Sequence, residues 1–376
     1  MLFLTSVFAN LVLPALVFCS PVVFHNRQEI GGSNTRNYIV GLKDGAPLAS
    51  VLGLLDGLGI TYSDLSIING FSGPLDDVSL TILRASPDVD YIAEDGIVSI
   101  FGTQTQTNAP WGVARLSQSN RLTNQNTNSL SFSYTYDSSA GGGVDIYILG
   151  VRTTHVQFGG RARWGATFGG YIDADENGHG THVAGTAAAS QFGVAKAVNI
   201  IAVKVLSDNG TGAVSDIVAG MNWVAASVQA SGRPSIASLS LGGSANTAFD
   251  NAATALVNMG IHVTVAAGNG NTDAERTSPA RAAGVVTVGA STIGDARASF
   301  SNYGSVVDIF APGDNIISCF KDSDTATPHV AGLIAYLIGL GGNKSPQAMI
   351  SQINSLSISG VLSGVREFIL LLTPKK

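Results

Sequence analysis

Cysteine and charge are both scarce in this sequence of 376 residues. The two cysteines are Cys19 and Cys319, and Cys19 lies in a leading segment that we expect to be removed, so a disulfide within the mature protein is excluded. We therefore expect Cys319 to be a small buried apolar residue. Charged side chains make up 12% of the chain, the net charge is −6 and no Lys/Arg-rich run occurs, which argues against a nucleic-acid partner.

Apolar residues and glycine are abundant instead. Hydrophobic residues make up 45% of the chain and glycine occurs 45 times, which favours a sizeable core with many tight turns over a helical bundle or a disordered chain. The apolar, uncharged start predicts a signal peptide at residues 1–20, and hence a secreted, extracellular protein with no membrane attachment after cleavage. A membrane anchor is the alternative, but an asparagine and two prolines interrupt the apolar run.

A small unit of strands and helices is expected near the N-terminus. Residues 38–42 have the pattern of a buried strand, residues 47–57 show helical spacing of leucine and valine, and residues 78–83 resemble another strand. A further strand at residues 89–95 closes this unit. Residues 101–108 then form a polar, uncharged stretch that we interpret as a linker and a natural site of proteolysis.

The rest of the chain alternates apolar strand patterns with helical patterns. The expected strands are residues 144–149, 199–205, 236–241, 262–267 and 285–288. The expected helices are residues 179–189, 214–230, 248–259 and 328–338. This rhythm predicts an α/β fold of three layers, with a mostly parallel sheet covered by helices on both faces. Reactive groups in such folds collect at the carboxyl ends of the strands.

Four motifs occur in order along this part of the chain. They are NGHGTHVAGT at residues 177–186, SLSLGG at 238–243, HVTVAAGN at 262–269 and ATPHVAG at 326–332. A lone HGTH is weak, since such a histidine can simply pack or cap a helix. Together, in this order and spacing, the motifs resemble those of the subtilisin-like serine proteases, and specifically of the proteinase-K-like secreted fungal branch.

The resemblance implies a domain organisation as well as a reaction. Residues 36–102 resemble the family's inhibitory, chaperoning propeptide, a small α+β ferredoxin-like domain, and residues 104–376 resemble the peptidase domain. The family hydrolyses peptide bonds of polypeptide substrates through an acyl-enzyme, without a cofactor in catalysis. We therefore expect polypeptide substrates and the chain's own propeptide as partners, and a monomer.

Roles for individual residues follow from the same resemblance. His179 would be the general base and Asn269 the side-chain donor of the oxyanion hole. The backbone would flank a bound peptide as added strands at Ser240, Leu241, Gly242, Gly243, Gly210 and Gly212. Asp308, with the carbonyls of Ala283 and Val285, matches a structural calcium site, although an ordinary turn residue is an equal interpretation of this carboxylate. His155, His182 and His329 are interpreted as structural, and Asp173 and Asp175 as parts of a polar loop.

The aspartate motif of the family is incomplete. The family has Asp-Thr-Gly after an apolar strand, whereas residues 144–150 read VDIYILG, as if Asp-Thr had been cut out before Gly150. Asp145 does not replace it. It lies five residues before the expected position, an odd offset that turns its side chain to the other face, and some ~15 Å away along the strand.

The serine motif is incomplete too. The family has Gly-Thr-Ser-Met-Ala-Thr-Pro-His, whereas residues 321–329 read KDSDTATPH, which places Asp324 where the nucleophile belongs. Ser323 and Thr325 are each one residue out of register, which on a helical turn is a rotation of about 100°. Helix capping is the plainer role for all three.

These gaps bear directly on activity. Loss of the serine alone from such a triad costs ~10⁶ in turnover, or ~8 kcal/mol of transition-state stabilisation. We therefore expect this chain to be nearly inactive as an endopeptidase, or to act as a pseudoprotease that binds peptides or its own propeptide. Two gaps at motif centres and an unusual C-terminal tail fit an error in the gene model as well as they fit evolved inactivity.

Overall fold

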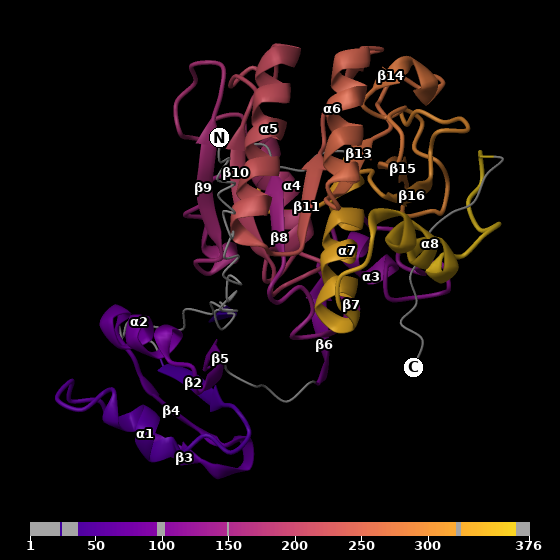
Figure 1. The fold of residues 1–376 in the computed structure, drawn as a ribbon. Helices are drawn as coiled ribbons and strands as arrows, with labels where there is room; N and C mark the ends of the chain where they lie inside the picture. The colour runs from indigo at the N-terminus through magenta and orange to yellow at the C-terminus, as the bar shows by residue number, and fades with distance from the viewer. Residues whose placement is uncertain (1–22, 25–36, 96–101, 149, 321–324, 366–376) are drawn as a thin grey trace, which may run out of the picture. The chain divides into compact units, whose positions relative to one another are not determined.

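The computed structural model describes residues 23–24, 37–95, 102–148, 150–320 and 325–365. These residues form two compact units, one within residues 1–98 and the other within residues 99–376 (Figure 1). The predicted signal peptide, Ser323 and Asp324 lie outside the described residues. Within the described part of the chain, no helix combines the length and the apolar character needed to cross a membrane.

The N-terminal unit is an antiparallel sheet with two helices. Its elements are β2 (Asn37–Leu42), α1 (Leu48–Gly53), β3 (Ser63–Leu65), the 3-10 helix η1 (Ser66–Ile68), β4 (Gly70–Pro74), α2 (Asp77–Ala85) and β5 (Val89–Glu94). The strands lie in the order β5-β2-β4-β3, and β1 (Val23–Phe24) pairs in parallel with β5. The succession βαββαβ with this order is the expected ferredoxin-like arrangement.

The strand predicted at residues 78–83 is wrong, because these residues lie in α2. Val78, Leu80 and Ile82 alternate as they would in a strand. However, Asp76 caps a helix here and accepts a hydrogen bond from the Ser79 N–H at 2.8 Å. Leu80 and Leu83 are buried one helical turn apart, whereas Val78 is exposed. The cap and the helical burial thus outweigh the alternation.

The C-terminal unit is built on a seven-stranded sheet. From one edge to the other, its strands are β16 (Ile309–Pro312), β15 (Val286–Ser291), β13 (His262–Ala266), β11 (Ser235–Leu239), β8 (Asp145–Ile148), β10 (Asn199–Lys204) and β9 (Ala162–Thr167). All neighbouring strands pair in parallel. Their carboxyl ends therefore share one edge of the sheet, where a site is expected.

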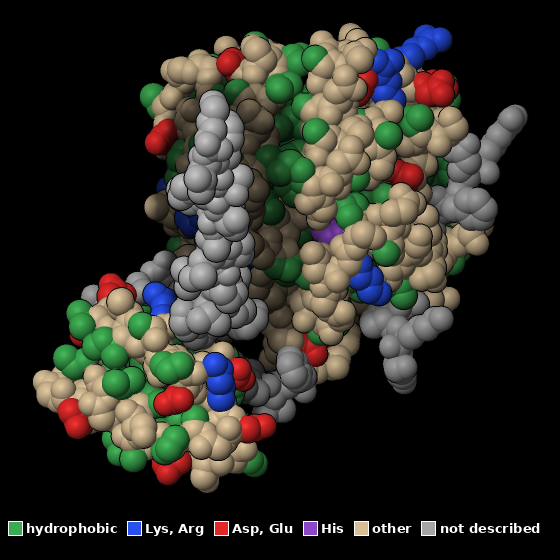
Figure 2. Space-filling model, in the orientation of Figure 1, with side chains coloured by type: hydrophobic (Ala, Val, Ile, Leu, Met, Phe, Trp, Pro, Cys, Tyr) green, Lys and Arg blue, Asp and Glu red, His purple; other side chains and the backbone are tan. Residues whose placement is uncertain are grey.

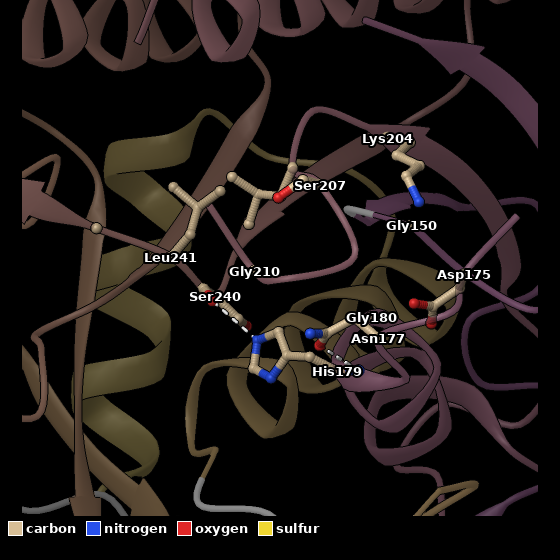
Figure 3. A pocket seen from close by; sticks show the side chains of 12 residues that line it. Gly150, Asp175, Asn177, His179, Gly180, Lys204, Ser207, Gly210, Ser240 and Leu241 are labelled. Carbon is tan, nitrogen blue, oxygen red and sulfur yellow. Dashed lines mark hydrogen bonds between the residues drawn. The ribbon is translucent and has the colours of Figure 1, made fainter. Parts of the chain in front are cut away.

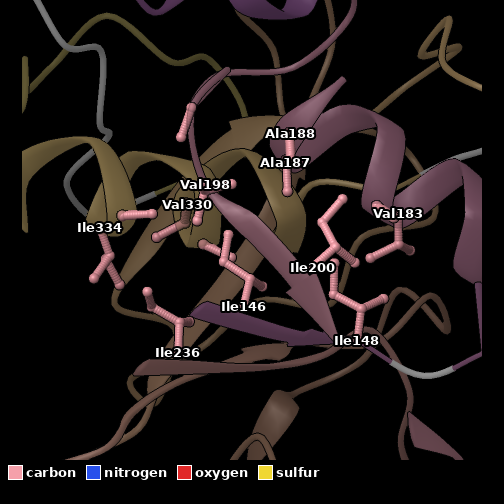
Figure 4. Close-up of a cluster of buried hydrophobic side chains, with 14 of the residues drawn as sticks. Ile146, Ile148, Val183, Ala187, Ala188, Val198, Ile200, Ile236, Val330 and Ile334 are labelled. Carbon is pink, nitrogen blue, oxygen red and sulfur yellow. The ribbon is translucent and has the colours of Figure 1, made fainter. Parts of the chain in front are cut away.

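Helices cover both faces of this sheet and complete three layers (Figure 1). On one face, α4 (His179–Ala188) and α7 (Thr327–Gly341) pack on Ile146 and Ile148 of β8 (Figure 4). On the other face, α5 (Val214–Ser231) and α6 (Thr247–Asn258) share a core with Tyr147. Successive residues of β8 thus point to opposite helical layers, as the pleat of a strand requires. The expected α/β/α fold is confirmed.

The predicted linker is in part a strand. From Thr103 onward, β6 (Thr103–Ala109) pairs antiparallel with β7 (Phe132–Asp137), and the hydroxyls of Thr105 and Thr135 lie 3.1 Å apart. Gln106 also donates from Nε2 to the carbonyl of Gln191 at 2.8 Å. A polar stretch can be a strand when its threonines suit extended backbone and a partner strand is near. The remaining elements are α3 (Trp111–Arg115), η2 (Val156–Phe158), β12 (Gly243–Ser244), η3 (Ala274–Arg276), β14 (Thr277–Ser278) and α8 (Pro346–Leu356).

Candidate active site

His179 is the first residue of α4, at the carboxyl edge of the sheet. The N-cap before it is Gly178, whose φ of 89° lies in the left-handed region that side chains disfavour. A Cβ on Gly178 would also meet the ring of Phe320 at 2.2 Å. The left-handed φ therefore favours glycine at this turn, and the half-exposed Phe320 ring would have to move to admit a side chain.

Asp175 supplies the cap that Gly178 cannot. Its Oδ1 accepts the Gly178 N–H at 2.9 Å, and its Oδ2 accepts the Thr181 N–H at 2.9 Å and the Thr181 hydroxyl at 2.6 Å. The Thr181 hydroxyl in turn accepts the Arg152 N–H at 2.8 Å. A carboxylate at a helix N-terminus satisfies free N–H groups and is stabilised by the helix dipole. Asp175 is thus more than a polar loop residue, because it joins the helix start to the segment after β8.

The His179 ring has one hydrogen-bond partner among the described residues. Its Nε2 lies 3.0 Å from the carbonyl oxygen of Ser240 (Figure 3). A carbonyl oxygen only accepts, so Nε2 carries the proton and donates it to this bond. The lone pair is then on Nδ1. In this arrangement Nε2 has no lone pair with which to take a proton from a nucleophile.

A pocket of about 330 Å³ opens beside His179 (Figure 3). It is lined by Gly150, Asp175, Asn177, His179, Gly180, Lys204, Leu206, Ser207, Gly210, Ser240, Leu241 and Gly242. Five of the predicted site residues therefore meet here, namely His179, Gly210, Ser240, Leu241 and Gly242. Gly212, Gly243 and Asn269 lie outside its lining. Gly243 instead begins β12, which pairs with β14.

Lys204 is a pocket residue that the sequence did not single out. It ends β10 and is buried, and its Nζ donates to the carbonyl of Ala174 at 2.7 Å and to Asp208 Oδ1 at 2.5 Å. These bonds hold the segment before α4 against the strand end. A charged residue directly after the apolar run of residues 200–203 was the available signal, because a buried lysine requires polar partners.

Asp145 lies away from the pocket, as the offset along the strand indicates. It is the first residue of β8 and pairs in register with Asn199 and Ser235, the first residues of β10 and β11. Its Oδ1 accepts from Arg233 Nε at 2.9 Å and from Asn199 Nδ2 at 3.0 Å, and the residue is 2% exposed. Asp145 is therefore a buried ion-pair partner at the amino edge of the sheet.

Asn269 and the predicted calcium residues lie at opposite ends of strands. Asn269 follows β13 at the carboxyl edge and is exposed. Asp308 precedes β16, and its Oδ2 accepts the Thr287 N–H at 2.8 Å; burial raises the pKa of this carboxyl above its usual value. Ala283 and Val285 flank the turn at Gly284 that leads into β15. Asp308 and these two residues thus share the amino edge, remote from His179.

His182 of α4, His329 of α7 and Cys319 are buried, whereas His155 is half-buried before η2. His182 donates from Nε2 to the carbonyl of Ile316 at 2.7 Å, and burial lowers the pKa of His329 to about 3. His155 accepts the Gln157 N–H through Nδ1 at 3.3 Å. Cys319 is buried, as expected, and burial raises its pKa to about 12, so it is not a reactive thiolate.

Two other features bear on partners and capping. On the face shown in Figure 2, Lys and Arg side chains of the described residues lie in small separate groups and form no broad basic surface.

Thr325 is buried before α7, but the N-cap of α7 is Ala326, with no side-chain cap. The capping role expected for Thr325 is therefore wrong.

Comparison with known proteins matches this chain to the subtilases. Residues 150–359 match the family model described as the Subtilase family. The chain is 42% identical over 360 residues to "Subtilisin-like serine protease AsES" of Sarocladium strictum, covering 92% of this chain and 90% of that protein. It is 43% identical over 309 residues to "Cuticle-degrading protease" of Metarhizium anisopliae, covering 79% and 78%.

Solved structures resemble most of this chain as well. A cold-adapted subtilisin-like serine proteinase matches with a TM-score of 0.64 and 40% identity, covering 71% of this chain and 100% of that chain. Sphericase matches with a TM-score of 0.60 and 26% identity, covering 71% and 96%. The residues matched by the family model, 150–359, include all those that line the pocket.

Proposed function

Since this chain belongs to the subtilase family of serine proteases, we propose that it binds extended polypeptides at the pocket beside His179 without the turnover of the family. The observation that carries this proposal is the bond from His179 Nε2 to the Ser240 carbonyl. It occupies the nitrogen that would otherwise accept a proton from the nucleophile.

The surroundings of His179 support the absence of turnover. The sequence offers no serine in the register of the nucleophile and no aspartate after β8. Asp175 makes no hydrogen bond to the His179 ring among the described residues, and its oxygens accept from Gly178 and Thr181 instead. A base with neither a nucleophile nor an orienting carboxylate forms no acyl-enzyme.

The backbone around the pocket supports peptide binding. Leu241 and Gly242 make no backbone hydrogen bond within the described chain, and they lie between β11 and β12 in the pocket wall. Unpaired N–H and C=O groups beside a pocket can pair with an extended peptide, which adds a strand. Gly210, with φ of 76°, also lines the pocket, and its missing side chain leaves room for a peptide backbone.

The direct test is to measure binding and hydrolysis on the same preparation. The full chain is purified from a host without other secreted proteases and given fluorescein-labelled Ala-Ala-Pro-Phe amide and the matching p-nitroanilide. We expect saturable anisotropy, no p-nitroaniline release above that of a His179→Ala control, and no new N-terminus near Gln104. Release that a fluorophosphonate reagent abolishes would refute the proposal, and so would a lack of peptide binding.

The alternative function, an active endopeptidase, depends on the two motif gaps. Sequencing the messenger across Leu149–Gly150 and Lys321–Pro328 distinguishes the two functions. Codons that restore Asp-Thr and Gly-Thr-Ser-Met would make the natural protein an ordinary protease of this family. Confirmation of both gaps leaves the binding function.

The remaining roles are proposed on the family resemblance. The N-terminal unit acts as an inhibitory propeptide, and the chain is secreted as a monomer. Calcium binds at Asp308 with the carbonyls of Ala283 and Val285. The described residues contain no group of three or more His, Cys, Asp or Glu side chains placed to hold a metal ion, so backbone carbonyls supply most of the ligands. A rise in the unfolding temperature with Ca²⁺, absent in Asp308→Asn, tests this site.

A further inference from the structure

A single buried side chain holds the loop that contains Asn269. Asn302 is 3% exposed. Its Oδ1 accepts the N–H groups of Gly270 and Thr272, both at 3.0 Å, and also lies 3.3 Å from the Thr272 hydroxyl. The loop after Asn269 is therefore tied to one oxygen atom.

The same residue also holds the loop before Asn269. Its Nδ2 donates to the carbonyl of Ala267 at 2.9 Å, and its backbone N–H donates to the carbonyl of Gly268 at 2.8 Å. Gly268 has φ of 105°, and a Cβ there would meet Asn302 Nδ2 at 2.5 Å. Only glycine allows the loop to approach this amide so closely.

Between these two anchored segments, Asn269 is left free. Its side chain is exposed, and no hydrogen bond joins its amide to another residue in the part of the chain that the structure describes. The side-chain amide of Asn302 thus makes hydrogen bonds to the loop on both sides of Asn269, whereas the amide of Asn269 is exposed to solvent. A donor fixed before its ligand arrives loses little freedom on binding.

We infer that Asn302 is a positioning residue, which presents the Asn269 side-chain amide to a carbonyl oxygen of a bound polypeptide. The inference rests on the proposed peptide binding. Asn302 itself touches no ligand and acts through Asn269. Its loss would release both flanks of the loop, because Gly270 and Thr272 would lose their acceptor.

Binding of fluorescein-labelled Ala-Ala-Pro-Phe amide to the full chain tests this coupling by anisotropy. We expect Asn269→Ala to weaken binding about tenfold, the factor that corresponds to ~1.4 kcal/mol. Asn302→Ala should weaken it about equally, and the double variant should be no weaker than Asn269→Ala alone, because both changes remove one interaction. The matched control is Asn199→Ala, which removes a hydrogen-bonded asparagine at the opposite edge of the sheet and should change binding less than about twofold.

Two results would overturn the inference. One is unchanged binding in Asn302→Ala while Asn269→Ala loses affinity. The other is a double variant about a hundredfold weaker than the unaltered chain, since independent losses multiply.

Hydrogen exchange of residues 267–272, measured by mass spectrometry without peptide, separates this inference from the proposed function. Faster exchange in Asn302→Ala, with no change in Asn199→Ala, supports the anchoring even if the unaltered chain fails to bind peptide and the proposed function falls. Unchanged exchange in Asn302→Ala refutes the anchoring whatever the peptide does.

Discussion

Replacement of Asp175 by alanine tests whether this carboxylate is the structural cap of α4. The change removes the acceptor of the Gly178 N–H, of the Thr181 N–H and of the Thr181 hydroxyl. Thr181 is 1% exposed, so water cannot readily replace the lost partner. The N–H groups of Gly178 and Thr181, at the start of α4, would then be buried donors without acceptors.

The magnitude follows from these bonds. Loss of a helix cap costs ~0.5–2 kcal/mol, and a buried donor left without a partner costs ~1–3 kcal/mol. These contributions overlap, because both count the Thr181 N–H, so we expect Asp175→Ala to lower the free energy of unfolding by ~2–3 kcal/mol. Asp175→Asn keeps one oxygen acceptor and should lose about half as much, since asparagine also caps helices well.

Urea unfolding, followed by the tryptophan fluorescence of the C-terminal unit, measures both variants. The matched control is Asp173→Ala, since Asp173 is an exposed neighbour whose one hydrogen-bond partner among the described residues is the Thr167 hydroxyl. That change should stay within ~0.5 kcal/mol. A loss below ~0.5 kcal/mol in Asp175→Ala, equal to the control, would show that the carboxylate does not stabilise the helix start.

Three further predictions concern stability. Gly178→Ala should destabilise the protein by ~1–3 kcal/mol more than Gly160→Ala. Both glycines have a left-handed φ, but a Cβ on Gly178 would meet Phe320, whereas nothing lies within 4 Å of a Cβ on Gly160. Equal losses in urea unfolding would contradict the contact with Phe320. Asp145→Ala should cost ~1–3 kcal/mol, because it leaves the half-buried guanidinium of Arg233 and the amide of Asn199 without their acceptor, and a thermal melt unchanged from the unaltered chain would exclude a structural ion pair. The pKa of His329 is about 3 in the folded protein, below the unfolded value of 6.5. Its contribution to the free energy of unfolding is therefore complete above pH 6.5 and declines by ~1.4 kcal/mol per pH unit down to pH 3. Urea midpoints at pH 7.5 and 4.5 should show this loss, and His329→Gln should show a smaller one.

The sequence predicted the sheet of the C-terminal unit well, for a physical reason. Strands buried on both faces, such as β8, β10 and β13, are short continuous apolar runs bounded by turn residues. Neither edge strand was predicted. β16 is a buried run of only four residues, and β9 has partly exposed residues and a Gly165 in its middle, which blur the pattern. Pairing with β15 and with β10 creates these two strands, and pairing is not a local property of the sequence.

The candidate site was predictable only in part. Gly178 and Gly210 have a left-handed φ, which a side chain would strain. Because such positions favour glycine, these two residues can be recognised in the sequence by their spacing from His179. The capping bonds of Asp175 depend on how the loop folds back onto α4. The anchoring role of Asn302 joins residues more than thirty positions apart in the sequence. Such roles require the tertiary structure.

We expect the two gaps in the sequence motifs to affect fold and activity differently. The first gap falls after Leu149, beyond the last described residue of β8, and Ile146 and Ile148 still fill the core between β8, α4 and α7. Shortening a connection beyond a buried strand changes its closure entropy by fractions of a kcal/mol. Catalysis instead needs groups in near-attack positions, where a displacement of ~1 Å costs about a hundredfold. The position of His179 depends on the helix start and its capping bonds, so we expect it to keep its place whether or not the two motif gaps are real.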